Sequence, residues 1–277
     1  MQSKKYGPHK NRLVRKWELS GSVLGKSIIV TGAGRGIGAE IARDLARNGA
    51  KVCLADLNEA AAQSVAKSIG GSAIATKVNV SNRKSTKAMI ALAVKAFGRL
   101  DVIFNNAGIS QTCNFMDVTE DDWHRIMDVN GLGVLIGTQE AARQMKAQGS
   151  GGKIINTASI AAKQGYPLFA HYCASKFAVA ALTQAAARAL APDKITVNAF
   201  GPGVVRTELW EQLDREFMEI GVTQKPDQAI NQFSEHILMG RYSKPEDLTG
   251  VTTFLASTAS DYMTGQTVMI DGGMVLL

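Results

Sequence analysis

From about residue 25 to its end, the sequence alternates short apolar runs with longer segments of helical periodicity. The apolar runs are typical of parallel strands that are buried on both faces, and the segments between them supply crossover helices. Strands are predicted at residues 27–31, 52–55, 73–78, 102–105, 153–157, 195–199 and 267–270. Helices are predicted at about 37–48, 58–69, 82–97, 120–148, 171–191 and 245–256.

This alternation predicts an α/β fold, namely a single doubly wound Rossmann-type domain over residues 23–277. Its seven-stranded parallel sheet carries helices on both faces. A chain of 277 residues is long enough to bury a full core, and no repeat, linker or low-complexity tract marks a second domain. The exception to the alternation is the segment 207–240, a polar–apolar mixture without a strand, which we expect to be a substrate lid.

The positive charge is concentrated at the amino end. The formal net charge is +7, and the first 20 residues contribute +5 because six cations stand there beside one acid, Glu18. The rest of the chain therefore carries only +2, so that we expect no nucleic-acid partner. Residues 1–22 are predicted to be a basic, disordered extension without the apolar stretch of a secretory signal.

The apolar runs and the cysteines exclude further classes of protein. No run approaches the ~18 apolar residues of a membrane helix, so no membrane partner is expected. Three cysteines (Cys53, Cys113 and Cys173) are too few and too scattered for a disulfide framework or a zinc site, so no metal is expected. They favour a reducing, cytoplasmic setting.

A glycine-rich string, TGAGRGIG at residues 31–38, joins the first predicted strand to the first predicted helix. Its glycines allow a tight turn and a close approach of the backbone to a pyrophosphate, whose charge the start of the helix stabilises. The string in this position therefore predicts a dinucleotide site. The binding residues expected here are Gly32, Gly34, Arg35, Gly36, Ile37 and Gly38.

Asp56 and Leu57 follow the second predicted strand, at the distance from the glycine string where adenosine ribose is bound. The Asp56 carboxylate would accept hydrogen bonds from the ribose hydroxyls and repel a 2′-phosphate. Arg35 instead favours NADP, since a cation in the loop could pair with that phosphate. We therefore expect NAD as the cofactor, with NADP as the alternative.

Polar side chains at later strand ends suggest catalysis. Ser159 follows the fifth predicted strand, and Tyr172 and Lys176 share one face of a predicted helix because they are four residues apart. A phenol has a reference pKa near ~10, but the adjacent ammonium, together with an oxidised nicotinamide, would lower it. Tyr172 could then act as general base on an alcohol or general acid on a ketone, with Ser159 holding the substrate oxygen.

With these motifs, and with Asn130 and residues 105–108, 202–207, 265–266 and 271–273, the chain resembles the short-chain dehydrogenase/reductase family from about residue 22 to the end. The resemblance implies that Asn130 holds a water in a proton relay through Lys176, which also grips the nicotinamide ribose. Asn79 stands where many members carry aspartate, and its carbonyl is expected to meet the adenine amino group. The other cofactor contacts implied are Val80, Asn106, Ala107, Gly108, Pro202, Gly203, Val205 and Thr207.

The segments 151–156, 209–210 and 260–265 resemble the polyol and vicinal-diol branch of that family. We therefore expect hydride transfer between NAD(H) and a small secondary alcohol, polyol or vicinal diol, or the corresponding ketone. Substrate contacts are expected from Ser159, Gln164, His171, Glu208 and Trp210. His171 is interpreted as a surface or cleft-edge residue, since no nucleophile elbow accompanies it.

Two other functions stay open. An NADPH-dependent carbonyl or 3-oxoacyl reductase is favoured by Arg35 and opposed by Asp56. A non-catalytic dinucleotide sensor or scaffold would use the basic extension, but the complete set of Asn130, Ser159, Tyr172 and Lys176 weighs against it. The alanine-rich helix at 174–191 resembles one that packs between subunits in the family, which implies a homotetramer.

Overall fold

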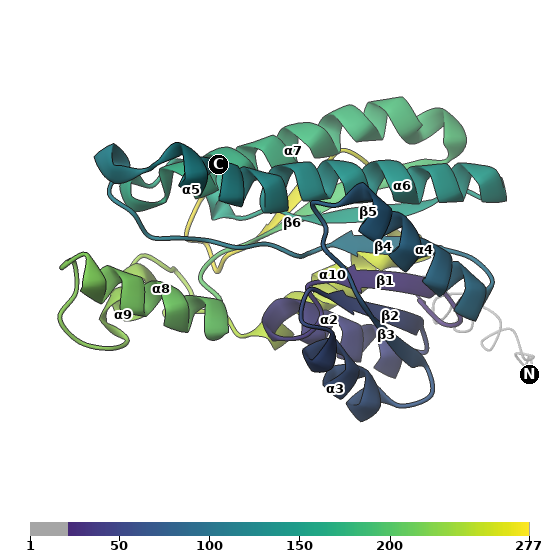
Figure 1. The fold of residues 1–277 in the computed structure, drawn as a ribbon, viewed down its shortest axis with the longest axis horizontal. Helices are drawn as coiled ribbons and strands as arrows, with labels where there is room; N and C mark the ends of the chain where they lie inside the picture. The colour runs from purple at the N-terminus through teal and green to yellow at the C-terminus, as the bar shows by residue number, and fades with distance from the viewer. Residues whose placement is uncertain (1–21, 277) are drawn as a thin grey trace, which may run out of the picture.

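A computed structural model describes residues 22–276, which form one seven-stranded parallel sheet (Figure 1). The strands lie in the order β3-β2-β1-β4-β5-β6-β7, so the direction of the winding reverses between β1 and β4. Their bounds are β1 Ser27–Thr31, β2 Lys51–Asp56, β3 Ala73–Lys77, β4 Val102–Asn105, β5 Gly152–Thr157, β6 Ile195–Pro202 and β7 Thr267–Ile270. This topology confirms the predicted fold class, and it opens a crevice beyond the carboxyl ends of β1 and β4.

Helices cover both faces of the sheet (Figure 1). One face packs against α2 (Gly36–Arg47), α3 (Glu59–Ile69) and α10 (Thr249–Ala256), and the other against α4 (Arg83–Phe97), α6 (Gly133–Gln148) and α7 (Ala170–Leu190). Successive strand residues alternate between the two sides. In β1, for example, Ile28 and Val30 join the core cluster of α2, whereas Ile29 joins that of α4 and α6.

The helix predicted over 120–148 is interrupted. It consists of α5 (Glu120–Met127), a wider π-helical turn over Asp128–Leu132, and α6. A capping box closes the start of α5: the Thr119 hydroxyl accepts from the Asp122 amide at 3.1 Å, and the Asp122 carboxylate accepts from the Thr119 amide at 3.3 Å. Asn130 lies in the π-helical turn, a feature that is frequent at functional sites.

The segment 207–240 contains two helices, α8 (Glu208–Glu219) and α9 (Gln228–Ser234), which the sequence pattern did not predict. They stand apart from the sheet layers (Figure 1). Their apolar side chains, including Leu213, Phe217 and Phe233, pack with Phe169 from the segment before α7. Aromatic packing therefore holds these helices beside the carboxyl ends of the strands.

Further predictions from the sequence concern the amino-terminal extension, membrane-spanning helices and the cysteines. The basic extension predicted for residues 1–22 falls, except for Ser22, outside the described residues. Within the described range, no helix has the combination of length and apolar character that is needed to span a membrane. The three cysteines are all free thiols.

Candidate active site

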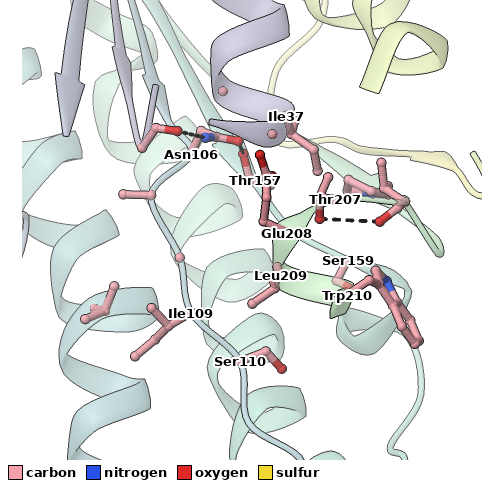
Figure 2. A pocket seen from close by; sticks show the side chains of 18 of the residues that line it. Ile37, Asn106, Ile109, Ser110, Thr157, Ser159, Thr207, Glu208, Leu209 and Trp210 are labelled. Atoms are coloured by element: carbon pink, nitrogen blue, oxygen red, sulfur yellow. Dashed lines mark hydrogen bonds between the residues drawn. The ribbon is translucent and has the colours of Figure 1, made fainter. Parts of the chain in front are cut away.

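A cavity of about 680 Å³ lies beyond the carboxyl ends of the strands and extends from the glycine-rich loop to α8. Figure 2 shows Ile37 and Asn106 towards one end, with Ile109, Ser110 and Trp210 towards the other. Every cofactor residue expected from the sequence lines it: Gly32, Gly34, Arg35, Gly36, Ile37, Gly38, Asp56, Leu57, Asn79, Val80, Asn106, Ala107, Gly108, Tyr172, Lys176, Pro202, Gly203, Val205 and Thr207.

The glycine-rich loop is shaped by close backbone contacts. A side chain on Gly38 would collide with the carbonyl oxygen of Gly32, and Gly32 itself has a φ of +65°. The loop is also joined to the end of β4, because the Thr31 hydroxyl accepts from the amides of Asn106 at 3.0 Å and Ala107 at 3.1 Å. The amino end of α2 is thereby fixed toward the cavity, as a pyrophosphate site requires.

The Asp56 carboxylate is anchored beside this loop. One of its oxygens accepts from the Gly34 amide and the other from the Asn58 amide, both at 2.9 Å. Each carboxylate oxygen has a further lone pair for a ligand hydroxyl. Leu57 is 65% exposed next to it, and Arg35 is exposed at the cavity edge. This donor and acceptor set fits a ribose diol with an apolar surface for the base.

Asn79 lines the cavity, but its carbonyl oxygen is already engaged. It accepts from the Ser81 amide at 3.1 Å and from the Ser81 hydroxyl at 2.7 Å, which closes a local turn. A carbonyl oxygen has two lone pairs, and both are used here. The expected contact of this oxygen with the adenine amino group would compete with these two hydrogen bonds, and it stays a prediction.

Tyr172 and Lys176 extend from one face of α7, with the Lys176 ammonium 5.6 Å from the centre of the Tyr172 ring. Lys176 Nζ donates to the carbonyl oxygen of Thr157 at 2.8 Å, which holds it at the end of β5. Ser159 follows the same strand and lines the cavity with Tyr172. The structure thus brings three of the four expected catalytic groups, Ser159, Tyr172 and Lys176, to the lining of one cavity.

The protein's own groups shift the pKa of Tyr172 in the direction opposite to the expectation. Burial raises this pKa to about 12, although a hydrogen bond with Ser159 opposes the shift. Burial also lowers the pKa of Lys176 to about 8, since desolvation disfavours the ammonium. The expected lowering of the Tyr172 pKa would therefore depend on the positive charge of an oxidised nicotinamide.

Asn130 is fully buried behind the cavity wall and does not line it. Its side-chain oxygen accepts from the Ile109 amide at 2.9 Å, and its amide group donates to the Ile109 carbonyl at 2.9 Å and to the Ser175 hydroxyl at 3.0 Å. The side chain therefore clamps the segment after β4 to α7. Its role in a proton relay stays a prediction.

Of the expected substrate contacts, Ser159, Glu208 and Trp210 line the cavity, whereas Gln164 and His171 do not. Gln164 is exposed to solvent. His171 is fully buried, with Nε2 3.3 Å from the Gln111 side-chain oxygen, so its interpretation as a surface or cleft-edge residue is wrong. Burial lowers the pKa of His171 and keeps its ring neutral.

Glu208 is directed toward the glycine-rich loop (Figure 2). One carboxylate oxygen lies 3.5 Å from the position that a Cβ atom would take on Gly36, at the start of α2. This placement puts a negative charge where a pyrophosphate is expected. Glu208 is therefore poorly placed for the substrate contact that was expected of it.

The sequence interpretation missed several residues that line the far end of the cavity: Ser110, Tyr166, Phe169, Gln212 and Phe233. Tyr166 and Phe169 lie between Ser159 and Tyr172 in the chain, which was the available signal. Ser110 similarly follows the motif at 105–108. For Phe233 the sequence offered no signal, since α9 itself was not predicted.

Residues 32–275 match the sequence profile described as enoyl-(acyl carrier protein) reductase. Because this match spans most of the chain, the chain belongs to the short-chain dehydrogenase/reductase family and is an oxidoreductase acting on CH–OH groups. The family resemblance drawn from the motifs is thereby confirmed.

Named relatives cover nearly the whole chain. The (S)-acetoin-forming diacetyl reductase of Staphylococcus epidermidis is 40% identical over 255 residues, covering 91% of this chain and 99% of that protein. The L-2,3-butanediol dehydrogenase of Corynebacterium glutamicum is 42% identical over 258 residues, with coverages of 91% and 99%. The sorbitol dehydrogenase of Cereibacter sphaeroides is 38% identical over 249 residues, with coverages of 90% and 97%.

Solved structures show the same fold. A short-chain type dehydrogenase/reductase from Mycobacterium marinum superimposes with a TM-score of 0.85 at 37% identity, covering 94% of this chain and 99% of that one. A 3-ketoacyl-(acyl-carrier-protein) reductase from Brucella melitensis, complexed with NADH, gives a TM-score of 0.83 at 35% identity, with coverages of 92% and 100%.

Proposed function

We propose that this protein transfers a hydride between NAD(H) and a small secondary alcohol, polyol or vicinal diol, or the corresponding ketone. The observation that carries the proposal is the meeting of Ser159, Tyr172 and Lys176 in one cavity with the glycine-rich loop and Asp56. The relatives named for diacetyl, butanediol and sorbitol support the same substrate range.

The roles of the side chains follow from their positions. When bound, the nicotinamide supplies the hydride donor or acceptor. Tyr172 carries its proton at neutral pH, because burial raises the pKa of its hydroxyl, and it can donate that proton to a ketone oxygen. In alcohol oxidation Tyr172 must first lose this proton. Ser159 donates a hydrogen bond to the same substrate oxygen, and Lys176 provides positive charge beside the phenol.

We propose NAD as the preferred cofactor because Asp56 offers a carboxylate to the ribose hydroxyls and repels a phosphate there. The NADPH-dependent alternative depends on Arg35, whose exposed side chain lies at the edge of the cavity. Asp56→Asn should reduce kcat/KM for NAD⁺ by roughly tenfold and improve use of NADP⁺, since like-charge repulsion is lost.

The test measures the initial rate at which reduced nicotinamide forms, followed by its absorbance. NAD⁺ and NADP⁺ are each assayed against a panel of substrates. The panel contains 2,3-butanediol, sorbitol, xylitol and a plain secondary alcohol. Turnover of a panel member with NAD⁺ is expected. Activity with NADP⁺ alone would establish the carbonyl-reductase alternative, and a complete lack of turnover would overturn the proposal.

We further propose a homotetramer that works in the cytoplasm. The alanine-rich helix α7 carries Phe177, which is 47% exposed, and an exposed aromatic ring on such a face supports a subunit contact. The three free thiols support a reducing compartment. Light scattering during size-exclusion chromatography will measure the mass of the assembly, and Phe177→Ser should lower that mass if α7 lies in the contact.

A further inference from the structure

His171 is a fully buried, titratable side chain that the proposed function does not use. It precedes Tyr172 on α7, and successive helix residues point about 100° apart, so the two side chains face different parts of the molecule. Tyr172 lines the cavity, whereas His171 does not, and its Nε2 atom lies 3.3 Å from the side-chain oxygen of Gln111. This contact joins α7 to the segment that follows β4.

The partners of Gln111 show which nitrogen of the His171 ring carries the hydrogen. The Gln111 side-chain oxygen accepts from the Arg125 guanidinium. Hydrogen bonds from Thr119 and, second, from the Gln111 amide group lower the pKa of Asp122 to about 2. The oxygen of Gln111 therefore faces His171 as an acceptor, so Nε2 donates and Nδ1 carries no hydrogen. Burial lowers the pKa of His171, which keeps the ring neutral near pH 7.

The segment bonded through Gln111 continues into the cavity wall. Ile109 and Ser110 line the cavity (Figure 2), and Gln111 comes directly after them. Backbone groups on either side of Gln111 bond to side chains of Asn130 and of α8. The contact with His171 adds a direct hydrogen bond to the helix that carries the catalytic phenol. This stretch of wall therefore has a defined position relative to that phenol.

We propose that His171 is a positioning residue for hydride transfer, an inference that rests on the proposed function. Its Nε2–H group, by donating to Gln111, fixes the cavity wall at residues 109–110 relative to Tyr172, and so sets how the substrate oxygen lies against the phenol. The imidazole acts through this contact alone, since it does not line the cavity. A displacement of about 1 Å in an active site can lower a rate by roughly 100-fold, so one buried hydrogen bond can strongly affect turnover.

A buried ring can also serve stability alone, and two substitutions separate these roles. His171→Phe keeps a ring of similar size but removes the hydrogen bond, together with Nδ1, which has no partner among the described residues. Gln111 keeps Arg125 as a donor, so the stability of this variant should equal or exceed that of the wild type. His171→Gln can place an amide nitrogen near the position of Nε2, but it fills the space of the ring poorly and should lower the melting temperature.

The test measures kcat and KM for 2,3-butanediol, the NADH dissociation constant and the melting temperature. His171→Phe should lower kcat at least about tenfold, with the NADH dissociation constant within about twofold of the wild type. His171→Gln should keep kcat within about threefold of the wild type, despite its lower melting temperature. His124→Phe, at an exposed position of α5, is the matched control and should change none of these quantities.

A substitution on the other side of the contact gives an independent measurement, also where His171→Phe fails to fold. Gln111→Leu removes the acceptor from a half-buried position and leaves α7 intact, so it should lower kcat to the same extent. In the double variant the two losses should not add, because both substitutions remove one interaction. Amide hydrogen exchange across residues 109–112 should accelerate in both single variants, whereas His171→Gln should retain the wild-type exchange.

The outcomes separate the role of His171 from the function beneath it. A wild-type kcat in His171→Phe would overturn the inference and leave the oxidoreductase function intact. The same holds if kcat follows the melting temperature through the variants, since that order indicates packing alone. Lack of turnover by the wild type with every substrate of the panel would overturn the proposed function, and this inference with it.

Discussion

The backbone amide of Thr112 donates to the carboxylate of Glu216 at 2.7 Å, which ties the loop after β4 to α8. The second oxygen of Glu216 accepts from the Gln212 side chain at 2.7 Å, one turn earlier on the same helix. Gln212 also reaches the Ser110 carbonyl. One carboxylate therefore fastens α8 to the edge of the cavity, where Gln212 and Ser110 line the wall.

Removing this carboxylate should loosen α8. In Glu216→Ala the Thr112 amide loses its partner, at a cost of about 1–3 kcal/mol for an unpaired buried group. We expect KM for the substrate to rise several-fold with a smaller change in kcat, and amide hydrogen exchange in α8 to accelerate. Glu219→Ala, at an exposed position on the same helix, is the control. Unchanged exchange in Glu216→Ala would show that other contacts fix α8.

Tyr172→Phe should greatly lower turnover without weakening the binding of the dinucleotide. The substitution removes only the hydroxyl, and general acid–base catalysis contributes roughly 10²–10⁴-fold to the rate. We expect kcat to fall by about that factor, with the dissociation constant of NADH, measured by fluorescence titration, within about twofold of wild type. A variant with ordinary kcat would exclude Tyr172 as the proton-transfer group.

Lys176→Met should stabilise the fold while it removes activity. Burial lowers the pKa of Lys176 from 10.5 to about 8, so the ammonium costs roughly 3 kcal/mol of stability near pH 7. Loss of its hydrogen bond to the Thr157 carbonyl offsets about 1 kcal/mol of the gain. Chemical denaturation at pH 7 should therefore show a net increase of about 2 kcal/mol in the free energy of unfolding.

The pH dependence of that gain gives a second check. Between pH 8 and 10.5 the unfolded wild-type chain binds the Lys176 proton and the folded chain does not, so wild-type stability rises with pH in this window. The advantage of Lys176→Met should shrink accordingly. Lys67→Met, at an exposed position of α3, should give no such gain at any pH. If the stability difference between Lys176→Met and the wild type stayed constant from pH 7 to 10.5, burial of the Lys176 ammonium would not be its cause.

Glu208→Gln should tighten dinucleotide binding. The Glu208 carboxylate lies at the start of α2, where it repels a pyrophosphate. Removal of the charge should lower the NADH dissociation constant by about two- to fivefold at low salt, and the difference should decrease at high ionic strength because salt screens exposed charges. Glu211→Gln, at an exposed position one turn further along α8, serves as the control. Weaker binding in Glu208→Gln would mean that the carboxylate accepts a hydrogen bond from the dinucleotide.

Features set by local spacing could be predicted from the sequence. The glycine-rich loop, Asp56 at the end of β2 and the pair Tyr172 and Lys176 all reach the cavity as expected, because strand ends and the helical repeat fix their directions. His171 could not be placed in this way. Adjacent helix residues point about 100° apart, so the neighbour of Tyr172 is turned into the protein interior.

The features that could not be predicted from the sequence depend on tertiary packing and on local turns. In α8 the apolar residues Leu209, Leu213 and Phe217 do recur at helical spacing, a signal that the sequence interpretation overlooked, whereas α9 has only seven residues. Both helices are held by rings such as Phe169, which precedes them in the chain by about 40 residues or more. The oxygen of Asn79 is engaged by a local turn that composition alone does not reveal. The pKa of Tyr172 likewise depends on how much surrounding chain excludes water from it.

Phe233 is the only residue of α9 that lines the cavity, and its ring packs with those of Tyr166, Phe169 and Trp210, which line the cavity too. The remainder of α9 can therefore accumulate substitutions, provided that the helix still packs against α8, without altering what the enzyme accepts. Among related proteins, α9 can therefore change the choice of substrate through one position, that of Phe233.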